Sequence, residues 1–240
     1  MFSRRVREVL AGLAGARCAV CGALLGAGYV RDCLLCSVCR RELAPRTGGY
    51  CPRCAELFED SSAPAYLCGD CRRRLPPWDG IGFFGPYRGV LKEMIHEFKF
   101  SGRLDRSRVL QELLARAFFN HGLGFPDLIV PVPLHSARLR SRGFNQSLEL
   151  AGFLGRVLGV SVVPGVLTRQ RNTVAQSSLT RGERLSNLKG AFTVRKELCR
   201  GRNIVLVDDV MTTGTTLRTC AAALRRQAAG RVEVLVLARA

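Results

Sequence analysis

The sequence predicts an α/β protein in which a small cysteine-rich module precedes a parallel sheet flanked by helices. Nine of the eleven cysteines lie between Cys18 and Cys71, the composition changes at Pro76-Pro77, and apolar strands alternate with helical patterns after that point. Because Pro-Pro disfavours both helix and strand, a boundary follows it. We therefore expect two domains, 1–78 and 79–240.

Eight cysteines form four Cys-x-x-Cys pairs, the spacing at which two thiolates converge on one metal ion. The pairs fall into two similar blocks and predict two structural zinc sites, one with Cys18, Cys21, Cys36 and Cys39, the other with Cys51, Cys54, Cys68 and Cys71. Pairing across the blocks is the alternative. Cys33 could replace a ligand, although we expect a spare buried thiol there.

The compartment is indicated by the same cysteines. Metal-type spacing favours a reducing cytoplasm over a disulfide framework. Residues 1–16 resemble a signal peptide, but their apolar positions recur at helical spacing and Glu8 interrupts them, so we expect a helix. No run of about 18 apolar residues occurs, which argues against membrane insertion.

Charge is unevenly distributed. The formal net charge is +18, and residues 79–240 hold 25 basic and 12 acidic residues, or +13. Residues 1–78 hold 12 and 7, or +5, and the −4 of two zinc–thiolate sites lowers this to about +1. The basic surface therefore belongs mainly to the second domain, where it suits a phosphate-rich partner.

Strands and helices are predicted to alternate in the second domain. The expected strands are 81–87, 127–132, 203–207 and 232–237, and the expected helices are 88–99, 107–120, 145–158 and 214–227. The strands are almost wholly apolar, as in a parallel sheet covered on both faces, and the helices carry one apolar face. Asn145 is expected to cap its helix and to do nothing more.

The segment RNIVLVDDVMTTGTTL, residues 202–217, carries the clearest chemistry. Asp208 and Asp209 follow an apolar strand, where adjacent carboxylates are costly unless they bind hydroxyls or a cation. The run 212–216 offers N–H groups and hydroxyls at the start of a helix, a favourable place for phosphate. Together they indicate a sugar-phosphate pocket; the alternative is a strand that ends in an ordinary capped helix.

A second polar turn begins at Pro133, after the strand at 127–132. His135 could donate to an anion there. Three arginines follow at positions 138, 140 and 142. They could neutralise a pyrophosphate or hold a nucleic-acid backbone, and a solvated arginine face is the alternative. The other two histidines and the last two cysteines are expected to be structural or solvated.

From Cys18 to Ala240 the chain resembles the ComF family of competence-associated proteins, of the ComFC-like kind. The resemblance rests on the four cysteine pairs and on three further segments, MIHEFKFSGR at 94–103, IVPVPLHSARLRSRGFNQS at 129–147 and AQSSLTRGERLSNLKGAF at 175–192. In addition, residues 202–217 look like the phosphoribosyl-pyrophosphate (PRPP) signature of type I phosphoribosyltransferases.

The resemblance implies a type I phosphoribosyltransferase-like fold and a pocket for PRPP with Mg²⁺. The implied residues are Asp208 and Asp209 for the ribose hydroxyls, Thr212, Thr213, Gly214, Thr215 and Thr216 for the 5′-phosphate, and Pro133, His135 and Arg138 in the loop that meets the pyrophosphate and Mg²⁺. Residues 169–190 correspond to an arm that covers the site.

Three functions fit the sequence. The first is a PRPP-binding protein, or a transferase with an unknown acceptor and unknown catalytic residues. The second is a non-catalytic protein that holds single-stranded DNA for the DNA-uptake machinery. The third is a sensor of PRPP or a related sugar phosphate. Residues 79–105, which should select an acceptor, show no base-recognition pattern, so the sequence leaves the acceptor open.

Overall fold

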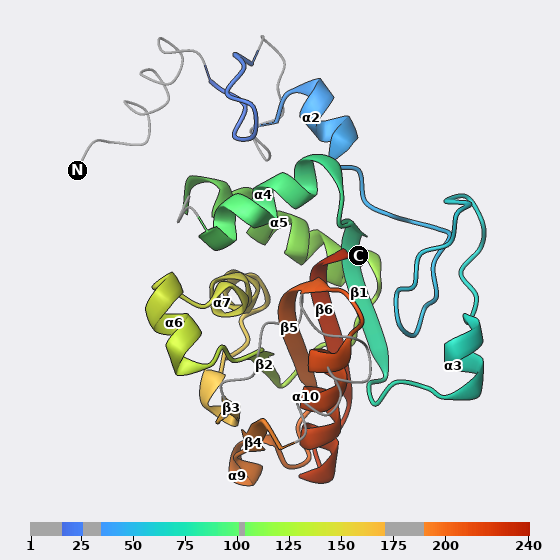
Figure 1. The fold of residues 1–240 in the computed structure, drawn as a ribbon, viewed down its shortest axis with the longest axis vertical. Coiled ribbons are helices and arrows are strands. Elements are labelled where there is room, and N and C mark those ends of the chain that lie inside the picture. The colour runs from blue at the N-terminus through green and yellow to red at the C-terminus, as the bar shows by residue number, and fades with distance from the viewer. Residues whose placement is uncertain (1–15, 26–34, 101–103, 171–189) are drawn as a thin grey trace.

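The computed structural model describes residues 16–25, 35–100, 104–170 and 190–240. Its centre is a four-stranded sheet with the order β1-β6-β5-β2, in which every neighbouring pair is parallel (Figure 1). The strands are β1 (Gly80–Pro86), β2 (Leu128–Pro131), β5 (Ile204–Met211) and β6 (Val232–Arg239). The α/β class with a parallel sheet is therefore confirmed.

Four long helices flank the sheet: α4 (Gly89–Phe100), α5 (Leu104–Asn120), α7 (Gln146–Leu158) and α10 (Thr215–Arg226). The short elements are α2 (Ser37–Glu42), α3 (Gly69–Arg73), α6 (Ser136–Arg142), the 3-10 turn η1 (Pro164–Val166), α9 (Lys196–Cys199) and an antiparallel pair, β3 (Leu167–Arg169) with β4 (Phe192–Val194). None of the described helices is long and apolar enough to cross a membrane.

The sheet separates two apolar cores because successive side chains of a strand point to opposite faces. Val205 and Leu235 pack with α4, α5 and α7 in one core. Leu206 and Val234 pack with α10 in the other. This double burial explains why the strands read as continuous apolar runs.

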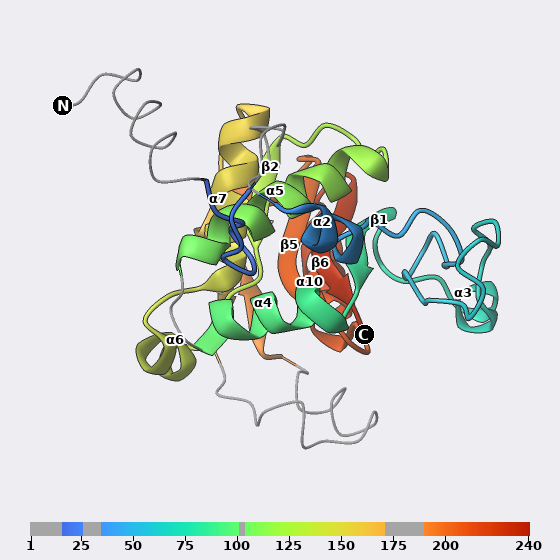
Figure 2. The ribbon, with the colours of Figure 1, turned by 90° about the horizontal axis from the view of Figure 1, so that it is seen from above.

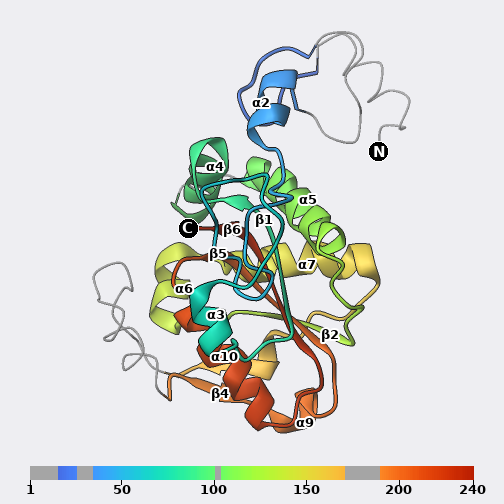
Figure 3. The same ribbon diagram turned by 90° about the vertical axis from the view of Figure 1, so that its right-hand side faces the viewer.

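The two cysteine blocks lie on different sides of the molecule (Figures 2 and 3). The first block, with α2, packs over α4, and its buried Leu35 and Leu43 join the core that contains Met94 and Phe98. The second block lies beside β1, with the Tyr50 ring against that of Phe83, and its helix α3 stands farther out from the sheet (Figures 1 and 2). The helix expected within 1–16, Cys33 and most of the arm at 169–190 fall outside the described residues.

Candidate functional site

The acidic pair lies at the carboxyl end of β5 and is held from two helices. Ser147, in the first turn of α7, donates its hydroxyl to Asp208 Oδ1 at 2.9 Å. Lys99, in the last turn of α4, places Nζ 3.0 Å from Asp209 Oδ1. The strand continues through both carboxylates to Met211, further than its apolar run predicts. Three separate elements therefore converge on this pair.

Burial dominates the electrostatics of Asp208. Removal from water, followed by the neighbouring charge of Asp209, raises the pKa of Asp208 to about 7. The Ser147 hydroxyl and the Lys99 ammonium act in the opposite direction. A ligand that brings hydroxyl donors or a cation would relieve the remaining cost of ionising this carboxyl.

The loop after β5 turns sharply into α10. Gly214 is the N-cap residue of α10 and has a φ of 71°, in the left-handed region that favours glycine, and an added Cβ would lie 3.2 Å from Met211 Sδ. Thr212 and Thr213 are exposed. A hollow of about 30 Å³ is lined by Asp208, Val210, Met211, Thr212, Gly214, Thr215, Thr216 and Leu217. The first acidic residue and the start of α10 thus border one hollow.

The second polar turn positions Ser147. Asn145 accepts from the Ser147 N–H at 3.0 Å and donates to the Val132 carbonyl at 3.1 Å. It therefore caps α7 and also ties that helix to the end of β2, which is more than the capping role expected from sequence. Because α7 is fixed there, its first turn meets Asp208.

The predicted pyrophosphate residues lie just before and within α6. His135 is the N-cap residue of α6, and its Nδ1 accepts from the Ala137 N–H at 3.2 Å, so only Nε2 is left to meet an anion. Arg138 is half-buried and Arg140 is exposed. Arg142 donates to Gln146 at 2.8 Å, and burial lowers the pKa of Arg142. The three arginines thus have different environments.

Each cysteine block brings its four sulfur atoms within 4.8 Å of one another. The two groups are Cys18, Cys21, Cys36 and Cys39, and Cys51, Cys54, Cys68 and Cys71. Burial, followed by the neighbouring thiols, raises the pKa of Cys39. Burial also raises the pKa of Cys71, to about 12. Four thiols this close cannot all ionise unless a cation joins them, and four thiolates are the usual donor set of structural zinc. The blocks therefore fit a double zinc ribbon.

Two further thiols and two histidines among the described residues lie apart from these clusters. Cys199 and Cys220 are fully buried. His121 donates Nε2 to the Phe83 carbonyl at 2.8 Å, and burial lowers its pKa. His96 is exposed. Lys99 and Ser147 were not among the predicted site residues, because each contact joins distant segments and no local spacing marks it.

Comparison with known proteins places the chain in a family. Residues 145–240 match the phosphoribosyl transferase domain. The chain is 39% identical to the DNA utilization protein YhgH of Escherichia coli K12 over 85% of its own length and 90% of that protein. It is 34% identical to competence protein F of Haemophilus influenzae, over 86% and 90%, and 30% identical to competence protein ComFC of Bacillus subtilis, over 79% and 77%. The chain therefore belongs to the ComF family, in which a double zinc ribbon precedes a phosphoribosyltransferase-type domain.

Proposed function

We propose that the protein binds PRPP with Mg²⁺ at the carboxyl end of β5. The observation that carries this proposal is the hollow that Asp208 shares with Thr212, Gly214 and Thr215. A sugar phosphate needs acceptors for its hydroxyls and N–H donors for its phosphate within one molecule's length. This hollow borders both.

In this proposal Asp208 and Asp209 accept from the ribose hydroxyls. Ser147 and Lys99 orient the two carboxylates, since each contacts one of them. The 5′-phosphate lies against the main-chain N–H groups and hydroxyls of Thr212, Thr213, Gly214, Thr215 and Thr216. The start of α10 favours a negative charge there.

The pyrophosphate and its Mg²⁺ would meet the segment from Pro133 to Arg138. His135 Nε2 can donate to an anion while Nδ1 caps α6. Mg²⁺ would neutralise the pyrophosphate charge. Arg138, the first arginine after Pro133 in the sequence, is the basic residue proposed to share that role. Positioning and charge neutralisation are the main requirements for departure of pyrophosphate.

Calorimetric titration of the zinc-loaded protein with Mg²⁺–PRPP tests binding. We expect saturable binding by the wild type and a loss of about 2–4 kcal/mol of binding free energy in Asp208→Asn plus Asp209→Asn. Asp127→Asn, at the opposite end of the β2–β5 pair, is the control and should bind as the wild type does. Wild type that gives no heat at millimolar PRPP contradicts the proposal. Pyrophosphate release in the presence of candidate acceptors tests transfer separately.

We also propose a role in handling single-stranded DNA. Relatives named DNA utilization protein and competence protein F support this role, as does the +13 charge of residues 79–240. Binding driven by phosphate contacts weakens steeply with salt. If the double Asp→Asn variant loses PRPP and keeps DNA, the two ligands use separate sites; if it loses both, they share one.

A further inference from the structure

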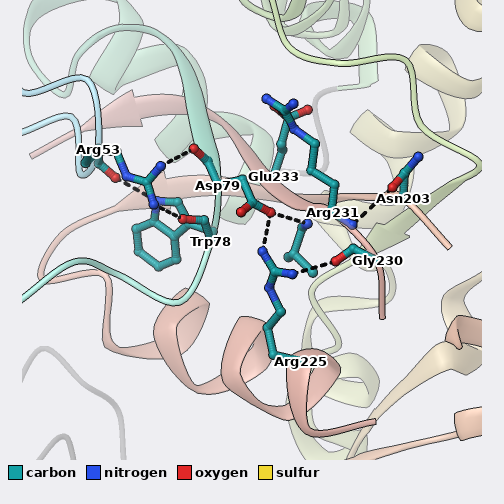
Figure 4. Close-up of polar contacts among 9 residues, drawn as sticks. Arg53, Trp78, Asp79, Asn203, Arg225, Gly230, Arg231 and Glu233 are labelled. Atoms are coloured by element: carbon teal, nitrogen blue, oxygen red, sulfur yellow. Dashed lines mark hydrogen bonds and ion pairs between the residues drawn. The ribbon is translucent and has the colours of Figure 1, made fainter. Parts of the chain in front are cut away.

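The second zinc ribbon is attached to the rest of the chain through its first knuckle, residues 51–56. Arg53 donates from its guanidinium to the main-chain oxygens of Trp78 and Asp79 (Figure 4). Trp78 in turn donates its indole N–H to the Arg53 carbonyl at 2.7 Å. Ala55 is fully buried in the core beneath α10. The knuckle is thus fixed to the segment that leads into β1.

That segment also contacts α10 near its start and in its last turn. The Asp79 carboxylate pairs with Arg225, in the last turn of α10, and accepts from the Val232 N–H at 2.8 Å (Figure 4). The Arg218 guanidinium, nearer the start of α10, lies 5.3 Å from the centroid of the Trp78 ring. The ribbon therefore reaches two points along the helix through residues 78 and 79.

Arg239, at the end of β6, forms the link to the loop that precedes α10. Its Nη1 donates to the Thr212 carbonyl at 2.6 Å, and its Nη2 pairs with the carboxylate of Glu56, two residues after Cys54. The Arg239 side chain is only 10% exposed, whereas that of Glu56 is 52% exposed. Nη1 also donates to the carbonyls of Met211 and Ala240, so these main-chain oxygens satisfy hydrogen bonds, while Glu56 supplies the negative charge that a guanidinium so far removed from water needs.

Away from Arg239, a cavity of about 600 Å³ separates the second zinc ribbon from the loop at residues 212–214, called here the phosphate loop. Cys54 and Cys68 line the cavity from the ribbon, and Thr213 and Gly214 line it from the loop. Atoms that face a cavity lack packing partners on that side. The loop is therefore connected to the ribbon at the cavity margins, chiefly through Arg239.

We propose that the second zinc ribbon holds α10 in place near both ends, through residues 78 and 79, and that Arg239 positions the phosphate loop by joining Glu56 to Thr212. These contacts together are called the brace. Zinc in the second site then strengthens binding of a 5′-phosphate. Without zinc the 51–56 knuckle no longer places Glu56, Arg239 loses its carboxylate partner, and the Thr212 carbonyl loses its fixed donor. This inference rests on the proposed sugar-phosphate function of the loop.

Two substitutions remove the link and keep every zinc-site cysteine: Arg239→Met and Glu56→Gln. Ribose 5-phosphate is the probe, because it reports on the phosphate end of the pocket. We expect its Kd, measured by calorimetry, to rise about tenfold in both variants, the size of one lost charge-assisted contact, while two zinc ions per chain are retained. Arg226→Met changes an exposed arginine at the end of the same helix and should leave Kd unchanged.

Ligand substitutions compare the two zinc sites directly. Cys68→Ser should raise the Kd for ribose 5-phosphate as much as Arg239→Met does, and the two together should raise it no further, because both break one link. Cys21→Ser, in the first site, should act independently of the Arg239 link, so its effect on this Kd should add to that of Arg239→Met. Additive effects of Cys68→Ser with Arg239→Met, or a lack of additivity of Cys21→Ser with Arg239→Met, would overturn the brace.

Hydrogen exchange of the amides at 212–216 tests the brace without a ligand. Faster exchange in Cys68→Ser and Arg239→Met, but not in Arg226→Met, supports it. If wild type binds neither ribose 5-phosphate nor PRPP while exchange accelerates as expected, the proposed function fails and the brace stands. Unchanged exchange in both variants overturns the brace whatever the protein binds.

Discussion

The two zinc ribbons are alike in sequence and different in how they join the domain. The first packs through apolar side chains, with Leu35 and Leu43 in one core with Met94 and Phe98 of α4. The second places Ala55 in the core beneath α10 and the Tyr50 ring against that of Phe83, and it adds hydrogen bonds and charges, from Arg53 to the 78–79 segment and from Glu56 to Arg239. Similar cysteine spacing thus supports two different kinds of interface.

The difference matters because the two ribbons support different halves of the candidate pocket. The helix under the first ribbon, α4, carries Lys99, which contacts Asp209. The loop beside the second ribbon carries Thr212, which Arg239 contacts. We infer that the first ribbon stabilises the half of the pocket proposed to bind the ribose hydroxyls and that the second stabilises the half proposed to bind the phosphate. Separate substitutions in the two ribbons can test this division.

Loss of the first zinc site should have the largest effect on folding stability. Cys21→Ser removes a ligand and frees an apolar cluster that is continuous with the main core, so we expect a loss of about 4 kcal/mol or more. Cys68→Ser should cost less, because Cys68 packs in a small apolar cluster with the other cysteines of its site, Phe58 and Leu67, whereas the apolar contact with the main core is made by Ala55. Melting temperatures with zinc content measured in parallel decide this. Equal losses would remove the distinction between the ribbons.

Lys99→Met should have the next largest effect. The substitution leaves Asp209 buried without its ammonium partner, and we expect a loss of about 2–3 kcal/mol in the free energy of unfolding. Lys92→Met, an exposed lysine on the same helix, is the control and should stay within about 0.5 kcal/mol of the wild type. Denaturant unfolding measures both. A Lys99→Met protein as stable as the control would show that Asp209 needs no partner.

Much of the fold could be predicted from sequence because long apolar runs have few alternatives. The strands around Phe83 and Val234 and the helix after Gly214 occur close to their predicted bounds. The β3–β4 pair was missed because strands of three residues carry no readable period. The extension of β5 through the acidic pair was missed because pairing with β6, from Asp208 opposite Val236 onward, continues it where apolarity does not.

The candidate site divides in the same way. Asp208 and Thr212 lie in one continuous segment, so the sequence alone could predict a sugar-phosphate site there. The contact between Ser147 and Asp208 spans 61 residues, and neither Lys99 nor Arg239 has a local spacing that points to its partner. Such contacts depend on how the helices pack on the sheet, which a single sequence does not specify.

Asp208→Asn should stabilise the protein in a pH-dependent way. The folded pKa of Asp208 is about 7, above the unfolded value of about 3.9, so its ionisation opposes folding. Below pH 4 the Asp208 carboxyl does not lower the free energy of unfolding. This destabilisation grows as the pH rises from 4 to 7 and reaches its full size above pH 7. We expect no gain in stability at pH 4 and about 1–2 kcal/mol at pH 8, since asparagine can still accept from Ser147. Thermal unfolding across this range measures it, and a gain that does not vary with pH would contradict the buried-carboxylate account.

The smallest expected effect locates DNA relative to the ribbons. Arg138→Ala plus Arg140→Ala leaves Arg142 on Gln146 and removes two charges from α6. If both contact phosphates of single-stranded DNA, the slope of log affinity against log salt should flatten by about 1.4, or about 1 kcal/mol over a fourfold change in salt.

Arg40→Ala plus Arg41→Ala, on exposed positions of α2 in the first ribbon, is the matched pair. Because zinc-bound thiolates offset most of the positive charge of residues 1–78, we expect this pair to leave the slope within about 0.3 of the wild-type value. Fluorescence anisotropy of a labelled oligonucleotide at several salt concentrations measures both pairs. If the α2 pair flattens the slope and the α6 pair does not, DNA lies on the first ribbon, and that ribbon has a binding role beyond its support of α4.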